Sequence, residues 1–278
     1  MGSGRWSTDV YTAAANYRAA TGPSAFAHGD GGARRAHPAL DPAGVFMRES
    51  RDSAEHPAST PIVVMFDVTG ATRAVPRALQ ARLPRLLGLL TGPGGVTDPQ
   101  LMFGAIGDAT RDPAPLQVGQ FESDNRMDQD LSRILPRGGP GAGRRASYEL
   151  AMYFLARHVV LDSLIERRRK GYLFLVGDRM PGEYVQPAQV RRVIGDELAQ
   201  PVPTRAILTE LQRKFEVFFI RPGGAGHGAD PAVLAAWRDL LPQHVLELED
   251  VAEICETVAR AVRTDAETPE LSLALRRP

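Results

Sequence analysis

The stretch from Ile62 to Gly70 reads IVVMFDVTG, and it indicates the class of fold. Its first five residues form an unbroken apolar run, which is typical of a central parallel strand that is covered on both faces. The run ends at Asp67, and Thr69-Gly70 follow as residues suited to a tight turn. The stretch therefore predicts a buried strand that presents a carboxylate and a hydroxyl, two residues apart, at its C-terminal end.

The pattern of a buried strand followed by a helix recurs along the chain. Two further apolar runs are followed by Gly-Asp, which places Asp108 and Asp178 at strand ends. Strands are expected at 62–66, 101–106, 116–121, 172–176, 216–220 and 245–248, and the third of these alternates apolar and polar residues as an edge strand does. Helices are expected at 74–90, 124–134, 147–166, 187–198, 204–214, around Trp237 and at 249–263. This alternation predicts an α/β fold with a doubly wound, mostly parallel open sheet in a three-layer sandwich, and with one antiparallel edge strand.

The sequence also predicts where several helices break, which face is buried and which residues cap them. Pro84 should bend or break the helix over 74–90. The segment 147–166 is expected to be one long helix, because apolar residues recur in it at three- and four-residue spacing. That stripe consists of Leu150, Phe154, His158, Leu161 and Ile165. Thr204 and Asp230 are expected to cap the helices that begin beside them.

Composition excludes several classes of function. Lys and Arg total 33 and Asp and Glu total 33, so the net charge is zero, which favours neither bulk nucleic-acid binding nor a polybasic membrane anchor. The one cysteine, Cys255, excludes a disulfide scaffold. We find no apolar run of roughly 18–20 residues and no signal-like apolar region in residues 1–20, so a cytoplasmic protein is expected. The preference for Arg over Lys, with abundant Ala, Gly and Pro, indicates a GC-rich bacterial genome.

The chain divides into three expected parts. Residues 1–58 are rich in Ala, Gly, Arg, Ser and His and lack an apolar pattern, so we expect an N-terminal arm that is extended or partly disordered. Residues 59–265 hold the strand–helix alternation and form the expected domain. Residues 266–278 are expected to be a loose C-terminal tail.

Aspartates at the ends of predicted strands are the most informative feature of the sequence. Asp67, Asp108 and Asp178 all follow strands whose C-terminal ends meet at one edge of a parallel sheet, where such folds bind ligands. Mg²⁺ prefers oxygen ligands and retains waters, so Asp67, Thr69 and Asp178 with waters could hold it. The alternative is that these residues only cap helices and turns.

The stretch IVVMFDVTG resembles the first strand and metal loop of von Willebrand factor A (vWA) domains. Their metal-ion-dependent adhesion site has the pattern Asp-x-Ser/Thr-x-Ser, then a distant Thr and a distant Asp. Asp67 and Thr69 match the first two positions, and LFLVGD places Asp178 at the last. The resemblance covers about residues 60–263 and so implies a vWA-like domain over 59–265. It implies a protein-binding module rather than a catalyst, in which the metal receives an acidic side chain of a protein partner.

The sequence also departs from the vWA pattern. Ala71 stands where the third motif position needs a hydroxyl, and in the Arg144-Arg145-Ala146 loop the next hydroxyl belongs to Ser147, a candidate helix cap. Arg179 directly follows Asp178 and adds a further cation.

Two versions of the site remain open. In the first, Mg²⁺ binds weakly through Asp67, Thr69, Asp178 and waters. In the second, no metal binds, and Arg145 or Arg179 pairs with the carboxylates. Asp108, Arg145, Ser147 and Arg179 are the candidate binding residues around the site.

Two other interpretations stay open beside the docking module. An enzyme could use Asp67 and Asp178 with a metal for phosphate chemistry. The segment 120–130 is dense in acids and could present an acidic surface to a partner, although most such segments are solvated faces.

Overall fold

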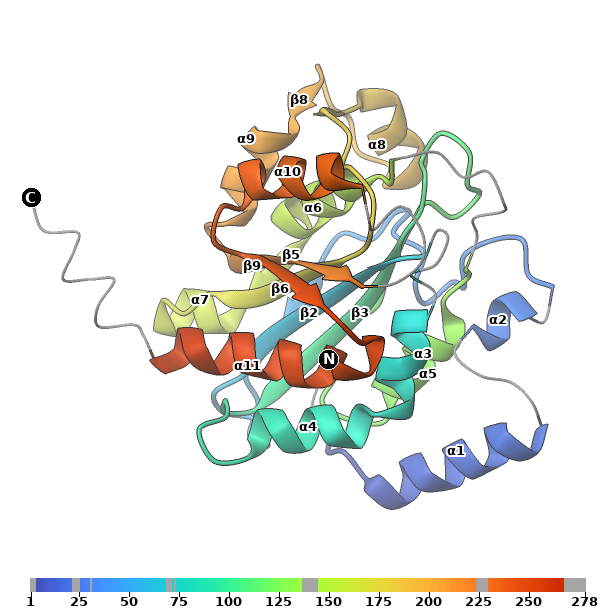
Figure 1. Ribbon diagram of the computed structural model, residues 1–278, viewed down its shortest axis with the longest axis vertical. Helices are drawn as coiled ribbons and strands as arrows, with labels where there is room; N and C mark the ends of the chain where they lie inside the picture. The colour runs from blue at the N-terminus through green and yellow to red at the C-terminus, as the bar shows by residue number, and fades with distance from the viewer. Residues whose placement is uncertain are drawn as a thin grey trace, which may run out of the picture.

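A six-stranded sheet forms the centre of the protein, with the strand order β10-β9-β6-β2-β3-β4 (Figure 1). The structure is a computed structural model that describes residues 4–21, 26–30, 32–68, 72, 74–136, 145–223 and 230–267. Neighbouring strands pair in parallel, except for β3 and β4, which are antiparallel at one edge. The strands are β2 (Thr60–Asp67), β3 (Pro99–Ile106), β4 (Leu116–Val118), β6 (Gly171–Val176), β9 (Phe215–Pro222) and β10 (Val245–Leu248). The predicted doubly wound α/β class, with its antiparallel edge strand, is confirmed.

The central strand β2 is apolar throughout because both of its faces are covered. Ile62, Val64 and Phe66 pack into one hydrophobic core, and Val63 and Met65 pack into a second core on the opposite face. All five side chains are buried. A strand between two helix layers therefore shows a continuous apolar run instead of the alternation of a half-exposed strand.

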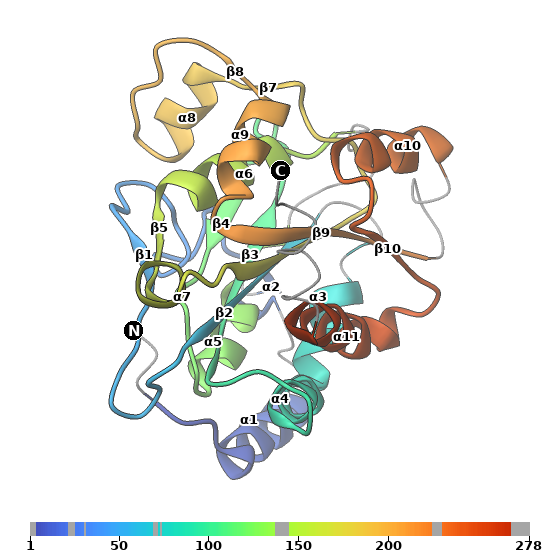
Figure 2. The same cartoon turned by 90° about the vertical axis from the view of Figure 1, so that its left-hand side faces the viewer.

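Helices cover both faces of the sheet, and Figure 2 shows the layers edge-on. One layer contains α3 (Ala74–Ala81), α4 (Leu83–Thr91), α5 (Arg126–Arg133), the 3₁₀ turn η3 (Val251–Glu253) and α11 (Ile254–Glu267). The other contains α6 (Tyr148–Arg157), α7 (Asp162–Arg167), α8 (Pro187–Val193), α9 (Thr204–Leu211) and α10 (Pro231–Leu240). Within the described ranges, none of these helices combines the length and the apolar character needed to cross a membrane.

Most helix boundaries follow from local chemistry. The helix expected over 74–90 breaks at Arg82, and Pro84 lies in the first turn of α4, where the missing N–H of proline costs little. Asp230 caps α10 as predicted, by accepting a hydrogen bond from the backbone N–H of Ala232. The prediction for Thr204 is wrong. Its hydroxyl donates to the carbonyl of Gly182 (2.7 Å) instead of capping α9.

The prediction of one long helix over 147–166 is wrong. α6 ends at Arg157, the chain then forms the short strand β5 (Val159–Leu161), and α7 begins at Asp162. β5 pairs in parallel with β1 (Arg48–Ser50), and the β-branched Val159 and Val160 suit a strand better than a helix. Ile165, expected on the buried stripe, is 56% exposed.

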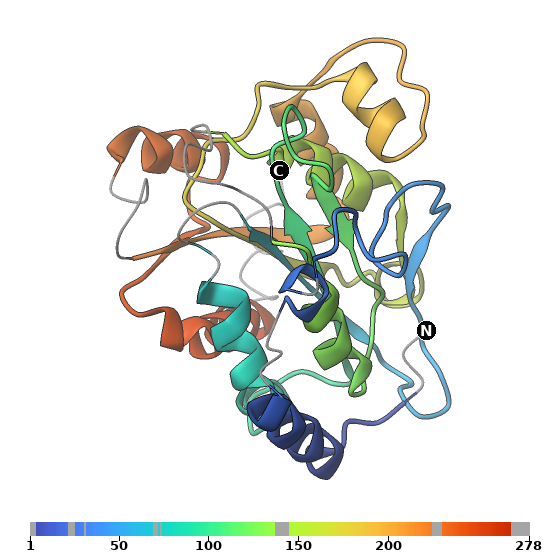
Figure 3. The same ribbon diagram turned by 90° about the vertical axis from the view of Figure 1, so that its right-hand side faces the viewer.

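The region predicted as an arm, where the structure describes it, lies against the domain (Figure 3). Besides β1 it holds α1 (Thr8–Thr21) and α2 (Ala27–Asp30). The Tyr11 hydroxyl donates to the backbone carbonyl of Gln80 in α3 (2.8 Å), and Arg18 pairs with Asp128 of α5. The ring of Trp6 lies 5.4 Å from that of Tyr11. At the other end of the chain, residues 268–278 of the expected tail lie outside the described residues.

Candidate functional site

The strand order places a topological switch point between β2 and β6. The chain passes from β2 to β3 on one side, and β6 later returns to the other side of β2. Asp67 is the last residue of β2, and Asp178 follows the end of β6 by two residues. Ligands of open α/β sheets bind beyond the strand ends at such a point, so both carboxylates lie at the position where the fold accommodates a site.

Arg179 lies between the two aspartates. Its Nε atom is 3.7 Å from Oδ2 of Asp67 and 3.7 Å from Oδ1 of Asp178. Asp67, Asp178 and Arg179 are 0%, 4% and 3% exposed. We call these residues the Asp67–Arg179–Asp178 cluster. They form a buried ion triad, in which one guanidinium faces two carboxylates.

Neighbouring side chains hold this cluster in place. The hydroxyl of Tyr148 donates to Oδ2 of Asp67 (3.1 Å), and burial, followed by the nearby Asp67 charge, raises the pKa of Tyr148 well above its usual value. Tyr148 is therefore a neutral donor. The indole N–H of Trp237 donates to the backbone carbonyl of Arg179 (2.9 Å), and its ring lies edge-on to that of Tyr148.

A glycine is required beside the cluster. A Cβ atom added to Gly177 would lie 1.9 Å from the Tyr148 hydroxyl and 2.7 Å from Cβ of Asp67. Neither atom can move without breaking the hydrogen bond between these residues. The absence of a side chain at position 177 thus lets β2, β6 and α6 approach closely enough to bury the triad.

The described residues favour the guanidinium over a divalent ion. A metal ion bound by Asp67 and Asp178 would lie beside the Arg179 charge. At an effective dielectric constant of about 20, two unit charges about 4 Å apart interact by about 4 kcal/mol, and a divalent ion would meet twice that repulsion. Nowhere among the described residues do three or more His, Cys, Asp or Glu side chains gather in a way that could hold a metal. With Arg179 in place, the cluster does not fit Mg²⁺.

The other predicted site residues lie nearby with partners of their own. Oδ1 of Asp108 accepts hydrogen bonds from the backbone N–H (2.8 Å) and the hydroxyl (2.6 Å) of Thr110. Ser147 precedes α6, but its hydroxyl accepts from the backbone N–H of Ala109 (2.9 Å) instead of capping the helix. Arg145 pairs with Glu183 (3.1 Å), and these side chains are 59% and 73% exposed. Thr69, Ala71 and Arg144 lie outside the described residues.

Sequence reasoning missed Glu149 at this edge. The side chain is buried, and burial raises its pKa to about 7. Its Oε2 accepts a hydrogen bond from the backbone N–H of Gly182 (2.7 Å), which anchors the loop that carries Asp178 and Arg179. The signal was present, because Glu149 is the one acid in a helix whose residues 148–156 are otherwise apolar and all buried. The predicted buried stripe began at Leu150 and did not include Glu149.

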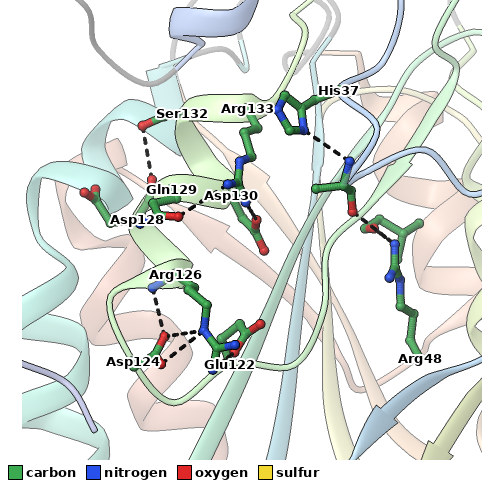
Figure 4. Close-up of polar contacts among 12 residues, drawn as sticks. His37, Arg48, Glu122, Asp124, Arg126, Asp128, Gln129, Asp130, Ser132 and Arg133 are labelled. Atoms are coloured by element: carbon green, nitrogen blue, oxygen red, sulfur yellow. Dashed lines mark hydrogen bonds and ion pairs between the residues drawn. The ribbon is translucent and has the colours of Figure 1, made fainter. Parts of the chain in front are cut away.

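The acid-dense segment 120–130 is paired internally. Figure 4 shows Glu122 and Asp124 beside Arg126, and Asp130 beside Arg133. Arg126 pairs with Glu122 (2.7 Å) and Asp124 (2.9 Å), and Arg133 pairs with Asp130 (3.1 Å). These contacts explain the acids by local structure, and they weaken the case for an acidic docking surface.

Comparison with known proteins supports the fold. No protein-family model matches the chain, and no curated protein sequence matches it. Among solved structures, the pilus adhesin SpaC from Lactobacillus rhamnosus GG, in its open conformation, is similar with a TM-score of 0.50 and 9% identity over 79% of this chain and 31% of the adhesin. Proximal thread matrix protein 1 from the mussel byssus, with a zinc-occupied MIDAS motif, has a TM-score of 0.46 and 14% identity over 75% of this chain and 48% of that protein. The chain thus spans less than half the length of either structure.

Proposed function

We propose that this chain is a vWA-like protein-interaction module that receives a protein partner at the C-terminal edge of its sheet. The observation that carries the proposal is the convergence of Asp67, Asp178 and Arg179 at the switch point between β2 and β6. The sequence resemblance to vWA domains and the fold shared with a pilus adhesin support a binding role.

The partner group proposed for this edge is an acidic side chain, and Arg145 is the exposed cation that would receive it. The backbone of Arg145 forms a β-bridge to Met180, next to Arg179, and its guanidinium pairs with Glu183, so this cation lies beside the loop that carries the cluster. Its present partner, Glu183, is itself exposed. An exposed ion pair contributes only about 0–1 kcal/mol, so a carboxylate of the partner can replace Glu183 at little cost.

An enzyme that uses Asp67 and Asp178 for phosphate chemistry is the less favoured alternative. Such a reaction needs carboxylates that a metal and a substrate can reach. Here both are buried and face Arg179. No observation in the described structure favours this alternative over docking.

The experiment is a pull-down from the native cell with tagged wild-type protein and two charge-reversal variants, Arg145→Glu and Lys170→Glu. Lys170 directly precedes β6 and pairs with Glu216 of β9, at the opposite end of these strands, and it is the matched control. We expect the proteins that wild type recovers to be lost several-fold with Arg145→Glu and kept with Lys170→Glu. Equal recovery by the two variants would show that this edge does not dock a partner. An Asp67→Ala variant, checked for folding by its melting curve, tests the cluster in the same assay.

A further inference from the structure

We infer that the surface of α3 and α5 beneath α1 is a second docking surface, which binds a helix that presents a tyrosine and an arginine on one face. Its resident ligand is α1 of the same chain. We call Gln80, Asn125 and Asp128 the α1-binding surface, because each of them makes a polar contact with residues 7–18. The inference goes beyond the proposed function, since it involves no residue of the Asp67–Arg179–Asp178 cluster.

α1 contacts this surface through one narrow face. The Tyr11 hydroxyl donates to the backbone carbonyl of Gln80 (2.8 Å). Arg18 follows Tyr11 by seven residues, which is about two helical turns, so both side chains lie on the same face. Arg18 pairs with Oδ2 of Asp128, and its guanidinium lies 5.8 Å from the centre of the Tyr11 ring. The tyrosine and the arginine therefore form one recognition unit.

The attachment of α1 is mostly polar. Among residues 8–20, Tyr11 is the only one that is buried, and Tyr17 on the outer side is 67% exposed. Just before the helix, the backbone N–H and carbonyl of Ser7 bond to the side-chain amide of Asn125 (3.0 and 2.9 Å). Helices in proteins are stabilised mainly by packing of an apolar face, and α1 packs little. A partner that offers the same polar bonds can therefore replace it.

Asp128 leaves part of its binding capacity unused. It is 3% exposed, and it lies on the opposite side of α5 from the Asp130–Arg133 pair (Figure 4). Arg18 pairs with Oδ2, whereas the buried Oδ1 has no hydrogen-bond partner among the described residues. Buried polar atoms are nearly always hydrogen-bonded, and a guanidinium can bond to both oxygens of a carboxylate at once. A partner arginine that reaches both oxygens forms one bond more than Arg18 does.

The chemistry of the partner follows from these contacts. Tyr11 belongs to the same hydrophobic core as Met127 and Leu131 of α5, so the surface accepts an aromatic ring beside apolar side chains. The carboxylate of Asp128 accepts a cation two turns further along the helix. The partner is thus a protein segment that is helical over at least two turns and carries an aromatic residue and an arginine seven residues apart.

The test uses fluorescence anisotropy of a labelled peptide of residues 4–21, with full-length wild-type protein, Arg18→Glu and Arg5→Glu. In wild type the tethered α1 competes at a high effective concentration, whereas Arg18→Glu places a carboxylate against Asp128 and releases α1. We expect the peptide to bind Arg18→Glu at least about tenfold more tightly than wild type. Arg5→Glu is the matched control, because it makes the same charge change at an exposed residue outside the helix, and it should bind the peptide as wild type does.

Two further comparisons test the recognition itself. Adding Asp128→Asn to the Arg18→Glu protein should abolish the gain, because the carboxylate that receives the arginine is then missing. A peptide that carries Arg18→Glu should bind the Arg18→Glu protein at least about tenfold more weakly than the unchanged peptide does. A peptide that carries Tyr17→Ala should bind as the unchanged peptide does, since Tyr17 lies on the exposed side.

The inference is overturned if wild type and Arg18→Glu bind the peptide equally, or if the gain persists with Asp128→Asn. Equal binding of the unchanged and the Arg18→Glu peptide would also overturn it. Arg18→Gln serves in the same assay if the circular dichroism spectrum shows that Arg18→Glu does not fold. None of these outcomes bears on Arg145, so the proposed docking at the strand-end edge is tested separately.

Discussion

Replacing Arg179 with glutamine should cost far more stability than replacing an exposed arginine. Nε of Arg179 is 3.7 Å from an oxygen of each of two buried carboxylates. At an effective dielectric constant of about 20, each contact contributes about 4 kcal/mol of attraction, much of which the desolvation of the ions offsets. Removing the cation takes the Arg179 charge away from both buried carboxylates. Breaking a buried pair in this way typically lowers the free energy of unfolding by about 3–5 kcal/mol.

The assay is urea denaturation followed by far-UV circular dichroism, with Arg205→Gln as the matched control. Arg205 pairs with Asp239 at 2.6 Å, and these side chains are 61% and 75% exposed, so its loss should cost at most about 1 kcal/mol. Adding Asp178→Asn to Arg179→Gln should restore part of the lost stability, because one of the two negative charges that faced Arg179 is then removed. A loss for Arg179→Gln no larger than that for Arg205→Gln would refute the description of the cluster as a buried ion triad.

Three further predictions test the surroundings of the cluster. Tyr148→Phe should lower the free energy of unfolding by about 1–3 kcal/mol, measured by urea denaturation, because Asp67 loses a buried donor. Gly177→Ala should lower the free energy of unfolding by about 1–3 kcal/mol or more, because the added Cβ overpacks the site. Gly88→Ala should raise it by up to about 1 kcal/mol, because an added Cβ has open space at this position in α4. Equal changes in the melting temperatures of the two variants would contradict this prediction. Burial raises the pKa of Glu149 from 4.5 to about 7, so the folded state binds this proton more tightly than the unfolded state does. The free energy of unfolding should therefore fall by about 3 kcal/mol as pH rises from about 4.5 to about 7, and then level off. Glu149→Gln should flatten this part of the stability profile, and an unchanged slope would exclude Glu149 as its source.

The fold was largely predictable because its strands are buried on both faces. The run at 62–66 and the similar runs at 101–106 and 172–176 locate β2, β3 and β6 closely, since continuous apolar segments bounded by Gly, Pro and Asp have few other interpretations. The prediction of one long helix over 147–166 was wrong because helical periodicity gives no information about pairing with a distant strand. Pairing of β1 with Val159–Leu161 outweighs the local pattern there.

The candidate site was predictable in position and less so in chemistry. Topology alone places Asp67 and Asp178 on either side of the switch point, and the structure places one buried guanidinium between them. The sequence could not separate Arg145 from Arg179, because both lie in loops at the same edge. Which of them points inward depends on how Trp237 and Glu149 fix the loop around 178–182, and such contacts between distant segments leave no periodic signal. The functional roles of these residues stay predictions.

The placement of the two tryptophans gives the protein its own optical probes. Trp237 is buried, stacks on Phe219 with ring centroids 4.0 Å apart, and donates to the Arg179 carbonyl, so its fluorescence reports on the domain next to the cluster. Trp6 lies beside Tyr11 in the N-terminal segment, which is tethered to the helix layer through polar contacts. One variant that keeps only Trp6 and one that keeps only Trp237 would therefore distinguish the release of α1 from global unfolding by fluorescence, without an attached dye. Added salt, which weakens the Arg18–Asp128 pair, is a suitable perturbation.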